Sequence, residues 1–193
     1  MLNHNGTQTI ETERLILRKF AFADAEDMLK YWISDPSVQF LYAEPIYINH
    51  QELAEPLGKY ISSYEKSDYY RWAVISKETN ECIGQVAFFL VDSENHFGEI
   101  EYCIGRTFQK KGFATEATKA VMKFGFETIN FHKIQICHRE GNTASQKVIE
   151  KCGLKYEGTL RDFFYRDGDY FGRLYYSTLK EEWSKKEHNL SSS

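Results

Sequence analysis

Hydrophobic and polar residues change their spacing along the chain, and each change predicts a different element. Residues 14–18 form a short β-type run, and a helix should follow from the capping residue Asp24. That helix should end before Pro36, because the residue preceding a proline resists helical dihedrals. Apolar spacing over residues 53–64 predicts a second helix, which should be kinked or start late because Pro56 interrupts it.

The middle of the chain has the two-residue period of strands. Residues 71–75 and 82–90 predict two strands of a meander, joined by a turn-rich segment. Residues 99–104 alternate strictly, which places Glu99 and Glu101 on one face of a third strand.

Helical and β-type patterns then alternate. The spacing predicts a helix over residues 115–130, a strand at 133–137 and a helix over 144–152 that stops at Gly153. A strand, a helix and a second strand in this order indicate a right-handed crossover between parallel strands.

The C-terminal part returns to strands. Apolar runs at 163–165 and 174–176 flank an Asp-Gly-Asp turn, which is a hairpin signal. We expect one domain over residues 10–183, with polar termini at 1–9 and 184–193.

Composition narrows the class of protein. The 193 residues are 42% hydrophobic and 16% aromatic, which is enough for one buried core. No stretch resembles a signal peptide or approaches the roughly 20 apolar residues of a membrane span, so a cytoplasmic location without a membrane partner is expected. The net charge of -4 weighs against nucleic acid and suits a cationic substrate. The four cysteines form no CxxC pair and the histidines lack ligand spacing, so we expect neither a disulfide framework nor a metal.

The segment from Gln109 to Thr115 carries the strongest chemical signal. Gly112 lets the backbone approach a ligand, and the first N–H groups of the helix after it lack internal partners. With Lys110 and Lys111, such a helix start attracts a diphosphate. The alternative is that Gly112 only shapes a tight connection and the lysines are solvated. Neither a Walker loop nor a Rossmann fingerprint is present.

Four ordered motifs resemble one family. Gln-Lys-Lys-Gly-Phe-Ala at 109–114 is similar to the Q/R-x-x-G-x-G/A acetyl-CoA motif of the GNAT N-acetyltransferases, and residues 142–154 resemble their N-x-x-S-x-x-V-x-E-K-x-G-F segment. Residues 12–18, with Asp24-Ala25 and Asp35-Pro36, resemble the branch that acetylates N-terminal amines of ribosomal proteins. The likeness extends through 157–161 and 167–170 and covers about residues 10–183.

The resemblance implies an α/β (α+β) GNAT fold: a mixed sheet of about six or seven strands, splayed parallel strands at its centre and helices on both faces. It also implies that acetyl-CoA binds and leaves as coenzyme A. Backbone groups of Cys103, Ile104 and Gly105 would pair with the pantetheine arm, and Asn142 would bond it. The diphosphate cradle would be Gln109, Lys110, Lys111, Gly112, Phe113, Ala114 and Thr115.

Acetyl transfer requires a base, because an ammonium has no lone pair for attack on a thioester. Glu99 lies where some GNAT enzymes carry a catalytic glutamate, and Glu101 shares its strand face. The alternative is that both are solvent-facing carboxylates. Ser145 matches a serine that protonates the leaving thiolate in the ribosomal-protein branch, although its hydroxyl would also suit helix capping. Many relatives use a tyrosine where this chain has Ile149.

The sequence says less about the acetyl acceptor than about the cofactor. Phe164 stands where some ribosomal-protein acetyltransferases place a glutamate base. Trp32, Tyr70, Trp72 and Phe164 are candidates for the acceptor-pocket wall, with packing as the alternative.

We weigh three functions. The first is an N-acetyltransferase that acts by direct attack on a protein N-terminal α-amine. The second is a small-molecule acetyltransferase for a polyamine, amino acid or aminoglycoside, since residues 157–170 also resemble polyamine enzymes. The third is a noncatalytic acetyl-CoA-binding module. A monomer or a homodimer is expected.

Overall fold

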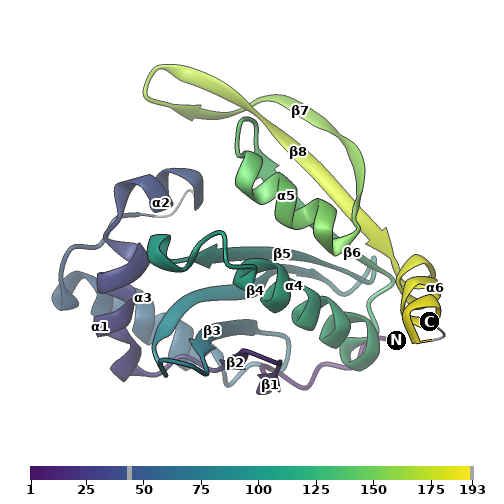
Figure 1. Ribbon diagram of the computed structural model, residues 1–193, viewed down its shortest axis with the longest axis horizontal. Helices are drawn as coiled ribbons and strands as arrows, with labels where there is room; N and C mark the ends of the chain where they lie inside the picture. Colours follow the sequence, from purple (N-terminus) through teal and green to yellow (C-terminus); the bar gives the residue numbers. More distant parts are fainter. Residues whose placement is uncertain (43–44, 192–193) are drawn as a thin grey trace. The chain divides into compact units, whose positions relative to one another are not determined.

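The computed structural model describes residues 1–42 and 45–191, with side chains up to residue 185. These residues form two compact units, each assembled from segments that are distant in sequence (Figure 1). Unit 1 contains residues 1–3, 90–100 and 122–193, and unit 2 contains residues 4–89 and 101–121.

The strands form one mixed sheet, in the order β1-β2-β3-β4-β5-β6-β8-β7. Their bounds are β1 (Ile10–Glu11), β2 (Leu15–Arg18), β3 (Tyr70–Ser76), β4 (Cys82–Asp92), β5 (Phe97–Ile104), β6 (Lys133–Arg139), β7 (Lys155–Arg166) and β8 (Asp169–Leu179). β5 and β6 are parallel, as the crossover predicted. The sheet has eight strands rather than six or seven, and the two-residue β1 is too short to leave a periodic signal.

In unit 2, β1, β2, β3 and β4 are antiparallel neighbours, which confirms the predicted meander. All seven residues of β3 are buried. Gly84 in β4 allows a close approach to β5, because a Cβ at this position would lie 2.2 Å from the carbonyl oxygen of Cys103. The end of β5 is therefore held against β4 at a contact that only glycine permits.

The first predicted helix is present in three short pieces of unit 2. A 3-10 turn, η1 (Phe22–Asp24), leads into α1 (Ala25–Met28), which continues as the π-helical turn η2 (Leu29–Ile33). The predicted end before Pro36 is confirmed, because η2 stops at Ile33 and Asp35 is not helical; Pro36 then opens a further helix, α2 (Pro36–Tyr42). A proline fits the first helical position, where its missing N–H has no intrahelical role.

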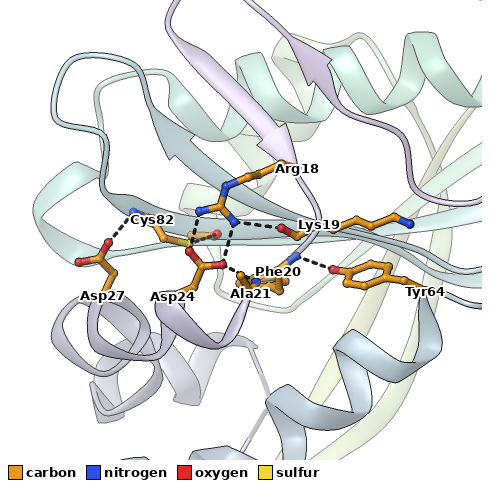
Figure 2. Close-up of polar contacts among 9 residues, drawn as sticks. Arg18, Lys19, Phe20, Ala21, Asp24, Asp27, Tyr64 and Cys82 are labelled. Carbon is orange, nitrogen blue, oxygen red and sulfur yellow. Dashed lines mark hydrogen bonds and ion pairs between the residues drawn. The ribbon is translucent and has the colours of Figure 1, made fainter.

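Asp24 occupies the N-cap position of α1, as predicted, but its side chain does not make the capping bond to that helix. The carboxylate instead accepts the backbone N–H of Ala21 at the start of η1 at 2.8 Å, and Arg18 Nη1 and Nη2 donate to its two oxygens at 2.8 and 2.7 Å (Figure 2). In the same view, Asp27 accepts a hydrogen bond from the backbone N–H of Cys82 at 2.7 Å. Asp24 therefore joins η1 to β2, and Asp27 joins α1 to β4.

Helix α3 (His50–Ser63) contains Pro56 in its interior. The predicted late start is wrong: the helix begins at His50 because Asn49 caps it, accepting a bond from the N–H of Glu52 at 2.9 Å. Leu53 and Leu57 are buried, so one face of α3 packs into the core of unit 2.

The long helix before β6 also starts earlier than its apolar pattern. It runs as α4 (Phe113–Phe124) and then as the π-helical turn η4 (Gly125–Ile129), which Asn130 ends in a left-handed conformation with φ of 72°. Residues 113–121 of α4 belong to unit 2 and residues 122–124 to unit 1.

Unit 1 confirms the predicted C-terminal order. The register of β5 with β6 pairs residues 97–100 with residues 133–136, and α5 (Thr143–Cys152) follows, ending at Gly153 with φ of 79°. β7 and β8 form the predicted hairpin, closed by Asp167 and Gly168 at φ of 53° and 94°. Two positive φ values suit the turn that matches strand twist.

Both ends of the chain are more ordered than the sequence predicted. Residues 184–191, expected as a polar tail, belong to helix α6 (Lys180–Ser191). Trp183 of this helix is buried, with its ring centroid 5.6 Å from that of Phe126. At the other end, Thr7 is buried and the indole N–H of Trp72 donates to the carbonyl of Gln8 at 2.6 Å. Within the described chain, every helix is too short or too polar to cross a bilayer.

Candidate active site

The loop between β5 and α4 is held in shape by its own residues. After Gly105 the chain makes a 3-10 turn, η3 (Arg106–Phe108), and the side chain of Gln109 donates from Nε2 to the carbonyl oxygen of Ile104 at 3.0 Å. Lys110 and Gly112 then adopt left-handed conformations, with φ of 63° and 87°. The glutamine of the motif therefore ties the loop to the end of β5.

Gly112 stands immediately before the first turn of α4. Its carbonyl accepts the N–H of Glu116 at 3.0 Å, so the N–H groups of Phe113, Ala114 and Thr115 precede the first intrahelical bond. A Cβ at Gly112 would lie 3.3 Å from Arg14 Nη2. The combination of a glycine loop and the start of a 12-residue helix fits a diphosphate, which such amides and the helix dipole attract.

Glu116 is an acidic residue in the first turn of α4, and Arg14 forms an ion pair with it. Arg14 Nε donates to Glu116 Oε2 at 2.7 Å and Nη1 donates to the carbonyl of Lys111 at 3.0 Å. Thr12 donates to Glu116 Oε1 at 2.6 Å. Burial by itself would raise the pKa of Glu116, but the hydrogen bonds from Thr12 and Arg14 lower it below its ordinary value. The carboxylate is thus ionised but neutralised, which limits its repulsion of a bound anion.

The two lysines of the loop are exposed. Lys111 Nζ lies 5.5 Å from the centroid of the Phe108 ring, while Lys110 projects from the left-handed position. Exposure is compatible with both interpretations of the sequence, diphosphate binding and plain solvation, and their role stays a prediction.

The backbone groups predicted to bind the pantetheine arm lie at the buried end of β5. Cys103 and Ile104 are buried, and the N–H of Gly105 donates to the carbonyl of Ile83 at 2.8 Å. The carbonyl of Ile104 accepts from Gln109. Two of the predicted groups therefore already have intramolecular partners, and pantetheine pairing stays a prediction.

Glu101, in unit 2, is part of an ion pair. Arg71 Nη2 donates to Glu101 Oε1 at 2.6 Å, while Arg71 Nη1 donates to Gln85 Oε1 at 2.6 Å. The three side chains come from β3, β4 and β5. The Glu101 side chain is 20% exposed.

Glu99, in unit 1, is held more tightly. Arg173 Nη2 donates to its Oε1 at 2.8 Å and Gln135 Nε2 donates to its Oε2 at 2.7 Å. Its side chain is only 3% exposed, so the alternative of a solvent-facing carboxylate is wrong for Glu99. Arg173 also donates from Nε to Cys137 Sγ at 3.0 Å. Burial raises the pKa of Cys137 to about 12, which keeps this thiol protonated at neutral pH.

Asn142 and Ser145 meet at the start of α5 in unit 1. Asn142 is the N-cap, and its Oδ1 accepts the backbone N–H of Ser145 at 3.1 Å. Capping is therefore performed by Asn142, and the Ser145 hydroxyl is not the N-cap group. The Nδ2 group of Asn142 is a donor that this bond does not use.

The four aromatic candidates for the acceptor pocket separate into two kinds. Trp32, Tyr70 and Trp72 are at most 1% exposed, and the packing alternative describes them: Tyr70 and Trp72 stack at a centroid distance of 6.2 Å. Phe164 on β7 is half-buried, and the Arg173 guanidinium lies 6.0 Å from its ring centroid. A pocket role stays a prediction for these residues.

Sequence reasoning missed the arginines. Arg71 and Arg173 are 30 and 74 residues away in sequence from the glutamates that they bind, so no local pattern pairs them. The available signal was a charged residue at the beginning of an otherwise apolar strand, as at Arg71. Among the residues whose side chains the structure describes, 1–42 and 45–185, no group of three or more acidic, histidine or cysteine side chains is arranged to hold a metal ion.

Comparison with known proteins identifies the chain. A family model for the acetyltransferase (GNAT) domain matches residues 14–155. The N-acetyltransferase p20 of Bacillus licheniformis, itself uncharacterized, is 34% identical over 179 residues, which cover 92% of this chain and 99% of the relative. The crystal structure of a GNAT-family acetyltransferase from Bacillus anthracis is 28% identical with a TM-score of 0.79, and the match covers 91% of this chain and 100% of that one.

Two further relatives have names that include a substrate. YdaF of Bacillus subtilis has a provisional name as a ribosomal N-acetyltransferase and is 35% identical over 100 residues, 52% of this chain and 55% of the relative. Spermidine N(1)-acetyltransferase of Escherichia coli K12 is 24% identical over 143 residues, 74% of this chain and 69% of the relative.

The mixed sheet, the glycine loop before α4 and these matches define an acetyl-CoA-dependent N-acetyltransferase. The chain belongs to the GNAT acetyltransferase family.

Proposed function

We propose that the protein acetylates the N-terminal α-amine of a protein or peptide, with Glu101 as the base. One observation carries the choice of acceptor. Each candidate carboxylate forms an ion pair with an arginine, Glu99 with Arg173 and Glu101 with Arg71. The net charge of each pair is therefore close to zero. A polyamine carries several positive charges and is best bound by carboxylates that lack such partners. A protein N-terminus carries a single ammonium and needs fewer unpaired negative charges for binding.

The relatives support the two acceptors unequally. The local identity of 35% to YdaF exceeds the 24% to the spermidine enzyme, although the match to the latter is longer. YdaF and the likeness of residues 12–18 to ribosomal-protein enzymes both favour a protein N-terminus. The polyamine remains the second candidate because the spermidine relative covers 74% of this chain.

The base must accept a proton from the acceptor ammonium, directly or through water. Glu101 suits this step better than Glu99, because its side chain is 20% exposed while that of Glu99 is 3% exposed. Arg71 contacts Glu101 at Oε1, so Oε2 lies outside the ion pair and has lone pairs that can take the proton. Glu99, bonded at both oxygens, is assigned a structural role in orienting Arg173.

The remaining residues bind or orient. Acetyl-CoA, when bound, supplies the acetyl thioester and leaves as coenzyme A. Gly112 and the first amides of α4 would hold its diphosphate, with Lys110 and Lys111 adding positive charge. Asn142 Nδ2 would donate to the pantetheine arm, and the Ser145 hydroxyl, or water, would return a proton to the departing sulfur.

A thiol-release assay with acetyl-CoA tests the acceptor. An alanine-initiated hexapeptide is compared with spermidine, an aminoglycoside and the same hexapeptide already blocked by N-acetylation. We expect kcat/KM for the free peptide to exceed that for spermidine by about tenfold or more, and the blocked peptide to be inert. Faster turnover of spermidine would refute the proposed acceptor and establish the polyamine instead.

The same assay tests the base. Glu101→Gln is expected to lower kcat by about 100-fold, within the range for general-base removal, and to leave the KM for acetyl-CoA within about twofold. Wild-type kcat in this variant would refute Glu101 as the base.

A further inference from the structure

The ion pair of Glu101 lies in a buried cluster of unit 2 that contains more polar groups than an ion pair needs. The Arg71 side chain, 10% exposed, donates to Gln85 and Glu101 and lies 4.3 Å from the ring centroid of Tyr60. Tyr42, the last residue of α2, interacts electrostatically with both Arg71 and Glu101. The cluster therefore joins α2 and α3 to three neighbouring strands.

Two buried polar atoms of this cluster have no hydrogen-bond partner among the described residues. They are the hydroxyl of Tyr42 and Nε of Arg71. A buried polar group without a partner costs about 1–3 kcal/mol, so folded proteins rarely retain one that nothing else satisfies. Burial raises the pKa of Tyr42 well above its ordinary value, and its hydroxyl is therefore neutral at physiological pH. A ligand or a bound water would satisfy it.

The part-buried pair of Arg18 and Asp24, also in unit 2, shows what a purely structural arrangement looks like. Arg18 uses both terminal nitrogens on the two oxygens of Asp24, and Nη1 also donates to the carbonyl of Lys19. Arg71 instead contacts one oxygen of Glu101 and gives its other terminal nitrogen to Gln85. This single contact fixes the carboxylate while keeping Oε2 outside the pair.

We propose that Glu101, Tyr42 and Arg71 form the subsite for the acceptor ammonium. Glu101 Oε2 and the Tyr42 hydroxyl oxygen accept two of the three N–H donors of a primary ammonium. Arg71 is a positioning residue, which holds Glu101 Oε1 and is itself oriented by Gln85 and Tyr60. The inference rests on the proposed role of Glu101 and adds the partners that place the ammonium.

Steady-state kinetics separate positioning from structure. With the alanine-initiated hexapeptide, or spermidine if it is the acceptor, Arg71→Met should lower kcat by about tenfold or more and leave the KM for acetyl-CoA within about twofold. Arg71→Lys, which keeps the charge, should restore part of kcat. In the Glu101→Gln background, Arg71→Met should cause no further loss, because the group that it positions is gone.

Tyr42→Phe tests the second acceptor of the subsite. Loss of one hydrogen bond to a charged group should raise the KM for the amine by about tenfold, with little change in the KM for acetyl-CoA. The matched control is Arg18→Met, which breaks a part-buried ion pair outside the subsite and should leave kcat and both KM values of the folded enzyme unchanged. Calorimetric binding of acetyl-CoA confirms that each variant is folded.

The outcomes distinguish this inference from the proposed function. Equal kcat losses from Arg71→Met with and without Glu101→Gln, or an unchanged amine KM in Tyr42→Phe, would overturn the subsite and leave Glu101 as the base. Wild-type kcat in Glu101→Gln would overturn both. If Arg71→Met does not fold, Arg71→Lys and Tyr42→Phe give the same decision through kcat and the amine KM.

Discussion

Gly112 is the residue on which the cofactor site depends most. Its φ of 87° favours glycine, and a Cβ would approach Arg14 Nη2 at 3.3 Å. Gly112→Val should weaken acetyl-CoA binding by about tenfold, because the side chain enters the space through which the diphosphate reaches the amides. Isothermal calorimetry measures the affinity.

A second glycine controls for backbone strain. Gly168, in the β7–β8 turn, has φ of 94°, and a Cβ added there would meet nothing within 4 Å. Gly168→Val should lose stability, since a β-branched residue disfavours this region, and should bind acetyl-CoA like the wild type. Equal loss of affinity in both variants would mean that general strain, and not the loop, explains the effect.

Glu116 gives a prediction of pH dependence. Its folded pKa lies below the ordinary value of 4.5, because the bonds from Thr12 and Arg14 outweigh burial. The ionised carboxylate therefore contributes stability that is complete above 4.5 and is lost as the pH falls through the lower folded pKa. Glu116→Gln should cost about 1 kcal/mol at pH 7, and the difference should shrink below pH 4.5.

Urea denaturation at both pH values measures this difference. Glu55→Gln is the control, because Glu55 pairs with Lys59 on the exposed face of α3 and should change stability little at either pH. A Glu116→Gln penalty that is the same in acid would contradict the assigned hydrogen bonds.

At the residue scale, the sequence predicts features whose residues are close together in the chain and does not predict contacts between distant residues. The Gln109–Thr115 loop could be located because its residues are contiguous and the helix after it has a clear apolar period. The partners of Glu99 and Glu101 could not, because Arg173 and Arg71 reach them only through strand pairing. The burial of Trp32 and Trp72 was also undetermined, since an aromatic side chain fits a core and a pocket wall equally well.

At the scale of elements, the start of α5 combines a structural and a predicted binding role in one side chain. Asn142 Oδ1 caps the helix and Nδ2 is the predicted pantetheine donor. Asn142→Asp keeps the capping oxygen and loses the donor, so stability should be retained while the Kd for acetyl-CoA rises by about tenfold.

Asn142→Ala should lose both, with a stability cost of about 1 kcal/mol from the missing cap. Thermal unfolding and calorimetry on the two variants separate the roles. Unchanged acetyl-CoA affinity in Asn142→Asp would remove Asn142 from the cofactor site.

The order of elements was more predictable than their ends. Strand and helix periods gave β3 to β6, α4, α5 and the hairpin, because each period repeats several times. The first residue of a helix was predicted wrongly where a capping residue, and not an apolar residue, marks the start, as at Asn49 before α3. Pro56 was misleading, because a proline does not prevent a helix whose buried face is already defined by Leu53 and Leu57.

At the scale of the whole molecule, the family could be predicted because its motifs occur in order over most of the chain, and the family model matches residues 14–155. The acceptor could not, since it depends on charges brought together from separate strands. Unit 1 contains the ion pair of Glu99 with Arg173, and unit 2 contains that of Glu101 with Arg71. No spacing in the sequence indicates that these glutamates are paired with arginines.

The proposed activity depends on binding of the coenzyme diphosphate to the backbone amides at the start of α4. A crystal structure of the protein with coenzyme A tests this contact directly. We predict diphosphate oxygens at hydrogen-bond distance, about 2.7–3.2 Å, from the backbone nitrogens at Gly112 to Thr115. Coenzyme A bound elsewhere, with these amides turned to solvent, would contradict the account.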